Sequence, residues 1–171
     1  GGRALYDLAA KRDEPIPVFA EMGSINPVII TKKALEKRAS EIASTYAGSI
    51  TLGTGQFCTN PGLILTLESD FASKFIDELG EKTANIDSFC MLHPNIHSAF
   101  NKKGAEVIEQ PETTLVAEYK GDVPQNYAKA KVVTAKGDAF LKNSKLHQEV
   151  FGPFSLVVQC KDETQLLQII E

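Results

Sequence analysis

The sequence has no apolar run long enough to cross a lipid bilayer, which takes about 20 residues in a helix. Its apolar stretches are short, like the one at residues 156–158. Residues 1–12 lack the apolar core and the cleavage-site pattern of a secretory signal peptide. These absences lead us to expect a cytoplasmic protein with no membrane partner.

Basic residues are not in excess, and cysteines are few. Lysine and arginine together number 18 against 22 acidic residues, the net charge is −4, and the two signs are interspersed. The chain therefore has no basic face that could neutralise a phosphate backbone, and we expect no nucleic-acid partner. Three cysteines, Cys58, Cys90 and Cys160, form no C-x-x-C pair. This odd number argues against a disulfide framework and leaves each cysteine as a thiol.

The overall amino-acid composition is that of an ordinary globular protein. Hydrophobic residues make up 43% and charged residues 23% of the 171 positions, which suits one folded domain. Helix signals alternate with strand signals, so we predict an α/β fold with a mostly parallel open sheet flanked by helices. The predicted strands are residues 17–21, 27–31, 63–67, 115–119, 131–134 and 154–160.

The predicted helices are marked by N-caps and by apolar residues at helical spacing. Thr31 and Ser69 precede two of them as caps, and Gly80 is the predicted end of the second. The second helix has a predicted apolar face made of Phe71, Phe75, Ile76 and Leu79. Further helices are predicted at residues 4–12, at 93–103 and from 162 onward.

The most informative segment is residues 53–62, which read Gly-Thr-Gly-Gln-Phe-Cys-Thr-Asn-Pro-Gly. Cys58 lies there among glycines, on a predicted loop between a helix and a strand, where substrate and backbone N–H groups can approach its sulfur. A thiolate is the nucleophilic form of cysteine, and such a setting favours it. The alternative is a small apolar cysteine in a tight turn. Gly53 and Gly55 do not make a dinucleotide fingerprint, because G-x-G-x-x-G needs a third glycine.

Two further segments place acidic residues next to glycine turns. Glu21 ends a predicted strand just before Gly23, at the edge where open α/β sheets gather functional groups. Glu149 and Phe151 precede a rigid Gly-Pro turn at residues 152–153. The alternatives are an exposed loop glutamate in the first segment and a strand entry with a core Phe151 in the second.

These three segments together resemble the aldehyde dehydrogenase superfamily, in that family's order and rough spacing. Phe-Ala-Glu-Met-Gly at 19–23 matches its glutamate motif, Gly-Gln-Phe-Cys at 55–58 its cysteine motif, and Glu-Val-Phe-Gly-Pro at 149–153 its Glu-x-Phe-Gly-Pro motif. The variants at 23–27 and 56–62 look most like 2-oxoglutarate-semialdehyde (2,5-dioxovalerate) dehydrogenases. The resemblance covers nearly the whole chain.

The resemblance implies oxidation of an aldehyde to its acid through a covalent intermediate. Cys58 attacks the aldehyde carbon to form a thiohemiacetal, and loss of hydride to NADP or NAD gives a thioester. Glu21 then serves as general base for the water that hydrolyses the thioester, and it can help to ionise the thiol. The backbone N–H of Cys58 supplies half of an oxyanion hole.

The resemblance also assigns cofactor-binding residues. Glu149 reaches the nicotinamide ribose, and Phe151 lies beside the nicotinamide ring. The backbone at Met22 meets the carboxamide, and Gly23 belongs to the same set. We expect no metal among the cofactors.

By the same resemblance, residues 1–12 are the last helix of the cofactor-binding domain. Residues 13–171 are the catalytic, cysteine-bearing domain, truncated at its C-terminus. The phosphate-binding turn and the family's oxyanion asparagine are expected upstream of this chain, and the oligomerisation arm downstream. We therefore expect the parent protein to be a homo-oligomer and the 171-residue chain alone to be inactive as a dehydrogenase.

Cys90, His93 and His97 form a rival constellation whose spacing could hold zinc. The glutamate of H-E-x-x-H is missing between the histidines, and no fourth ligand follows, so a solvated helix start is the better interpretation. Cys160 alternates with Val158 on a predicted strand and is expected in the core.

Two rival functions complete the set of hypotheses. One is a cofactor-free cysteine hydrolase or esterase that uses Cys58 and Glu21 on activated esters, although no histidine or lysine partner for the thiol is evident. The other is a non-catalytic interaction domain in which these residues are vestigial, although both residues are present.

Overall fold

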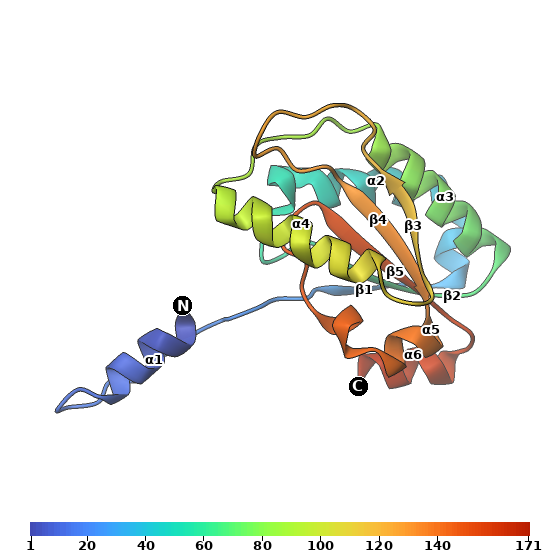
Figure 1. The fold of residues 1–171 in the computed structure, drawn as a ribbon. Coiled ribbons are helices and arrows are strands. Elements are labelled where there is room, and N and C mark those ends of the chain that lie inside the picture. Colours follow the sequence, from blue (N-terminus) through green and yellow to red (C-terminus); the bar gives the residue numbers. More distant parts are fainter.

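A computed structural model describes residues 1–171 and shows a five-stranded sheet between two layers of helices (Figure 1). The strand order is β1-β2-β5-β4-β3, with β3 alone antiparallel to its neighbour. The prediction of a mostly parallel α/β sheet is therefore confirmed. The strands are β1 (Pro27–Ile30), β2 (Leu63–Leu67), β3 (Thr113–Glu118), β4 (Lys131–Lys136) and β5 (Phe154–Cys160).

Each face of the sheet carries its own hydrophobic core. Side chains alternate along β5, so that Val157 joins one core while Leu156 and Val158 join the other. The first core is covered by α2 (Lys32–Thr51) and α3 (Asp70–Ala84). The second is covered by α4 (Pro94–Ile108), α5 (Gly137–Lys142) and the short η2 (Ser144–His147), with α6 (Glu163–Ile170) packed against it.

The structure confirms the predicted N-caps but not the predicted end of α3. Thr31 and Ser69 accept hydrogen bonds from the third residue that follows each of them, and His93 caps α4. The prediction that α3 ends at Gly80 is wrong, since the helix continues to Ala84. Gly80 is instead a packing position, because a Cβ there would lie 2.8 Å from a methyl group of Val116 on β3.

The N-terminal part of the chain stands apart from the sheet (Figure 1). Helix α1 (Gly2–Ala10) is followed by an extended segment that leads to β1. The predicted strand at residues 17–21 is wrong, because this segment pairs with no other strand. Pro15 and Pro17 have no N–H to donate to a ladder, and Phe19 is 96% exposed. None of the helices has both the length and the apolar character needed to span a membrane.

Candidate active site

The loop that carries Cys58 lies between α2 and β2, as predicted, and begins with an unusual turn. Helix α2 leads into the turn η1 (Leu52–Gly55), where Gly53, Thr54 and Gly55 all have positive φ, at 54°, 59° and 63°. Such left-handed conformations favour glycine. A Cβ on Gly55 would also lie 2.2 Å from the carbonyl oxygen of Gly152. Glycine at this position therefore lets the cysteine loop contact the backbone of the Glu-x-Phe-Gly-Pro segment.

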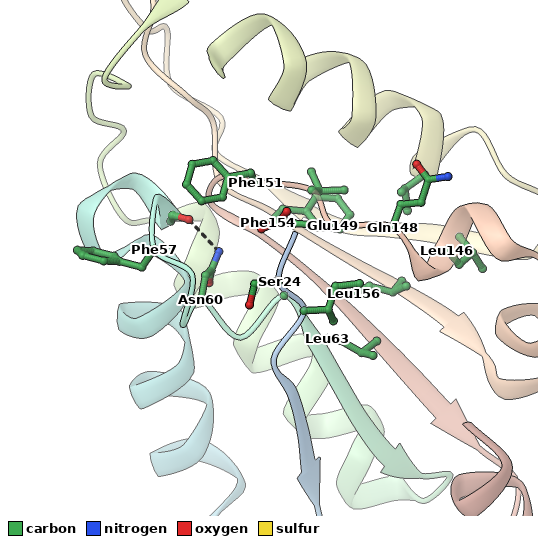
Figure 2. Close-up of a pocket in the computed structure, with 15 residues that line it drawn as sticks. Ser24, Phe57, Asn60, Leu63, Leu146, Gln148, Glu149, Phe151, Phe154 and Leu156 are labelled. Carbon is green, nitrogen blue, oxygen red and sulfur yellow. Dashed lines mark hydrogen bonds between the residues drawn. The ribbon is translucent and has the colours of Figure 1, made fainter. Parts of the chain in front are cut away.

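The side chain of Asn60 donates hydrogen bonds to both segments of this contact. Its Nδ2 donates to the carbonyl oxygen of Gly152 over 2.7 Å and to that of Gly55 over 3.2 Å, in the region that Figure 2 shows. One amide therefore joins both sides of a contact between segments that are far apart in the sequence. On the opposite side of the segment, Lys103 Nζ of α4 donates to the carbonyl oxygen of Glu149 over 3.1 Å.

Cys58 is exposed, and of its backbone groups only the carbonyl is hydrogen-bonded within the chain. The hydroxyl of Ser24 donates to the Cys58 carbonyl oxygen over 2.8 Å, and Asn26 Nδ2 donates to the same oxygen. The backbone N–H groups of Cys58 and Thr59 have no acceptor within the chain. They are therefore free to donate to a thiolate or to an oxyanion formed on the bound substrate.

Glu21 and its neighbours lie on the extended segment before β1. Glu21 is exposed within this chain, and Met22 is 70% exposed. Gly23 packs close to Glu149, since a Cβ on Gly23 would lie 3.7 Å from Glu149 Oε2. The structure thus brings the glutamate motif and the Glu-x-Phe-Gly-Pro motif together without the strand that the sequence predicted.

All six predicted site residues line one open pocket of about 240 Å³, which we call the thiol pocket. Its lining consists of Glu21, Met22, Gly23, Ser24, Cys58, Glu149 and Phe151. Ser24 is the member that sequence reasoning missed, although it lies within the quoted motif variant at 23–27. Three motifs that are widely separated along the chain therefore meet at one hollow in the surface.

A second, more enclosed cavity of about 30 Å³ adjoins the thiol pocket and is mainly apolar (Figure 2). Ser24, Glu149 and Phe151 line both spaces, so the two are neighbours. Leu63, Leu146 and Leu156 are among the apolar side chains around it. Phe151 is partly exposed and borders both spaces. The alternative that placed Phe151 in the core is therefore wrong, although its strand entry is present, since β5 begins at Phe154.

The remaining candidate residues lie elsewhere and have structural contacts. His93 Nδ1 accepts from the N–H of Asn95 as the cap of α4, and His97 Nε2 lies 3.0 Å from Asn101 Nδ2. No group of three or more His, Cys, Asp or Glu side chains is arranged to hold a metal ion. Cys160 is fully buried in the core, as predicted.

The three thiols are expected to react at different rates with iodoacetamide in the folded chain. Burial, with smaller effects from Asp162 and Glu68, raises the pKa of Cys160 to about 11. Its thiolate is therefore scarce until the pH approaches that value, and we expect labelling at pH 8 to be roughly a hundredfold slower than for an ordinary exposed thiol. Cys58 and Cys90 are both exposed. We expect Cys58 to react faster than Cys90, because free N–H groups lie on its loop.

Peptide mapping after limited labelling measures all three rates in one sample. Labelling at equal rates at all three sites would contradict a catalytic role for the Cys58 loop. Unfolded chain serves as the control, since the three thiols should then react alike.

Comparisons with known proteins agree with this arrangement. The model of the aldehyde dehydrogenase family matches residues 1–171. The chain is 35% identical over 171 residues to alpha-ketoglutaric semialdehyde dehydrogenase 2 of Azospirillum brasilense, covering 100% of the chain and 33% of the relative. It is 34% identical over 174 residues to alpha-ketoglutaric semialdehyde dehydrogenase of Acinetobacter baylyi, again covering 100% of the chain and 33% of the relative. The chain thus spans about a third of the length of these relatives.

Solved structures share the fold at lower sequence identity. A proline utilization A protein from Bdellovibrio bacteriovorus superposes with a TM-score of 0.78 at 22% identity, over 98% of this chain and 18% of that one. An NAD-dependent benzaldehyde dehydrogenase from Corynebacterium glutamicum gives a TM-score of 0.76 at 19% identity, over 98% of this chain and 36% of that one. With the family match over its whole length, the chain belongs to the aldehyde dehydrogenase family.

Proposed function

We propose that this chain supplies the catalytic part of an NAD(P)-dependent aldehyde dehydrogenase, with 2,5-dioxovalerate as the substrate. The observation that carries the proposal is the thiol pocket, where an exposed cysteine, a glutamate and the Glu149–Phe151 pair converge. The substrate assignment is supported by two relatives at 34–35% identity that are named for alpha-ketoglutaric semialdehyde. The parent protein is proposed to be a cytoplasmic homo-oligomer.

In this proposal Cys58 is the nucleophile. Its thiolate adds to the aldehyde carbon, giving a thiohemiacetal whose oxygen lies within reach of the free N–H groups of the loop. Covalent attachment divides a difficult oxidation into two easier steps. Loss of a hydride from the thiohemiacetal to the nicotinamide cofactor would leave a thioester. Glu21, which lines the same pocket, accepts a proton from the water that attacks this thioester and releases the acid.

The residues at the pocket fit the nicotinamide end of a cofactor. Glu149 offers a carboxylate that can accept from ribose hydroxyls, and Phe151 offers an aromatic ring that can lie beside a planar one. Gly23 has no side chain to fill the space next to that carboxylate. NADP or NAD bound here would supply the acceptor for the hydride that leaves the carbon attached to Cys58.

We further propose that residues 1–12 belong to a cofactor-binding domain and residues 13–171 to the catalytic domain. Helix α1 buries a single residue, Ala9, while Leu5, Tyr6 and Leu8 are half exposed or more. An apolar helix surface of this kind supports packing against a part of the protein outside this chain.

The experiment that tests the proposal uses the full-length polypeptide that contains this chain. Incubation with 2,5-dioxovalerate and either NADP or NAD should produce reduced cofactor, followed by absorbance. Succinic semialdehyde and benzaldehyde serve as comparison substrates. A lower kcat/KM for 2,5-dioxovalerate than for either of them would contradict the substrate assignment.

Replacing Glu21 by Gln in that polypeptide should separate the two halves of the reaction. Because the proposed base acts on the water of the second half, thioester formation should persist while its hydrolysis slows by roughly 10²–10⁴-fold. Rapid mixing should then show a burst of reduced cofactor followed by a slow phase. Unchanged turnover would remove Glu21 from the mechanism, and Glu14→Gln, on the same exposed segment, is the matched control.

A further inference from the structure

The carbonyl oxygen of Cys58 is the meeting point of two side chains from the segment that follows Glu21. Ser24 Oγ donates to it over 2.8 Å, and Asn26 Nδ2 donates to the same oxygen. Asn26 Nδ2 also lies 3.3 Å from Ser24 Oγ. One loop carbonyl thus receives two side-chain donors from a segment more than thirty positions away in the sequence.

These contacts determine how the peptide after Cys58 is turned. In a trans peptide the C=O and N–H groups point in opposite directions. With its carbonyl held toward Ser24 and Asn26, the peptide directs the N–H of Thr59 away from them, and this N–H has no acceptor within the chain. An exposed carbonyl oxygen can accept hydrogen bonds from water, so the Cys58 carbonyl does not need two protein donors to be fully hydrogen-bonded.

The same contacts also bring the two proposed reacting residues together. Ser24 lies three positions after Glu21 and lines the thiol pocket beside Cys58. The glutamate segment before β1 is otherwise unpaired. Its hydrogen bonds to the cysteine loop are those of the hydroxyl and the amide that converge on the Cys58 carbonyl.

We infer that Ser24 and Asn26 are positioning residues, which hold the Cys58 peptide so that the thiol stays in the thiol pocket beside Glu21 and the Thr59 N–H stays turned away from both side chains. This inference rests on the proposed function of Cys58 as nucleophile. Neither residue touches the reacting atoms; both act through the Cys58 backbone.

The test is carried out in the full-length polypeptide with Ser24→Ala, Asn26→Ala and the double variant. Loss of both donors should slow iodoacetamide labelling of Cys58 by about tenfold, and each single change by about threefold, because the peptide that holds the thiol in its pocket loses its side-chain hydrogen bonds. Cys90 and Cys160 in the same molecule should keep their labelling rates. The kcat for aldehyde oxidation should fall with the Cys58 rate while the KM changes by less than about twofold.

Ser24→Thr keeps the hydroxyl and should restore the labelling rate of Cys58. Matched controls are Ser44→Ala, a helix hydroxyl bonded to the Ser40 carbonyl, and Asn101→Ala on α4, which should leave all three rates unchanged.

Unchanged Cys58 labelling in the double variant would overturn the inference, as would equal slowing at Cys90. Faster labelling of Cys160 in the double variant would show that its fold has loosened. The labelling rates of Cys58 and Cys90 in the single variants then decide whether the inference holds. Failure of the proposed function is a separate result, seen as full activity in Cys58→Ala, because the labelling measurement requires no dehydrogenase activity.

Discussion

Replacing Cys58 by Ala in the full-length polypeptide is expected to abolish aldehyde oxidation, with kcat reduced by roughly 10⁴-fold or more. The expectation follows from the position of the thiol, which is exposed in the thiol pocket and which is the only thiol among the residues that line it. Removing it removes the covalent intermediate altogether, so the loss should appear in kcat and not only in KM. Absorbance of the reduced cofactor measures the effect.

Cys90→Ala is the matched control for this experiment. Cys90 is also exposed, but its sulfur contacts Asn126 Nδ2 and the Met91 carbonyl, each at 3.4 Å, outside the thiol pocket. The variant should retain full activity. If Cys58→Ala keeps more than a few per cent of the wild-type rate while Cys90→Ala loses activity, the nucleophile has been assigned to the wrong residue.

A polypeptide limited to these 171 residues is expected to fold and yet to show no dehydrogenase activity. The sheet has a hydrophobic core on each face, which supports independent folding. Hydride transfer requires the nicotinamide to be held against the carbon bound to Cys58, and positioning of this kind accounts for ~7–11 kcal/mol of a barrier. The pocket residues offer contacts for the nicotinamide end alone, and loss of the oxyanion asparagine that the family resemblance implies would cost a further ~2.7–4 kcal/mol.

The measurement is incubation of the purified 171-residue chain with NADP or NAD and aldehyde, while circular dichroism verifies the fold. A slow esterase activity on activated esters is compatible with the proposal, because that reaction needs only the thiol and water. Clear cofactor reduction that disappears in Cys58→Ala would show that the cofactor site lies within these residues.

Much of the fold could be predicted because its signals are local. Strand β5 was predicted with its full bounds, since its apolar residues, interrupted only by Ser155 and Gln159, fit a strand buried on both faces. The caps at Thr31 and Ser69 depend on one side chain and the N–H three residues later. Helix α5 carried no comparable cap and was missed.

The errors arose where tertiary contacts decide the outcome. Gly80 reads as a helix end, yet the approach of Val116 makes it a packing position inside α3. Phe71 fits the apolar helical spacing but is 36% exposed, in the first turn of the same helix. The run at residues 17–21 has strand-like composition, but no partner strand lies beside it.

The candidate site was recognisable from short motifs, whereas the bonds that assemble it were not. Cys58 and Glu21 stand out by residue type and by their glycine-rich neighbours. Nothing in the sequence indicates that Ser24 bonds to the Cys58 carbonyl, or that Asn60 bonds to Gly152 across the chain. Such contacts depend on the relative placement of segments, which only the folded sheet fixes.

The strand order also has a consequence for folding kinetics and for chain synthesis. The middle strand, β5, is the last strand in the sequence, and both β2 and β4 pair with it. During translation, the inner edges of those two strands stay without their partner until β5 emerges. The parallel pairing of β2 with β5 joins residues far apart in the sequence, and such pairings fold slowly and leave intermediates prone to aggregation. Gly152 lies just before β5, so the loop that carries Cys58 gains its contact with Gly152 only after this part of the chain has been made.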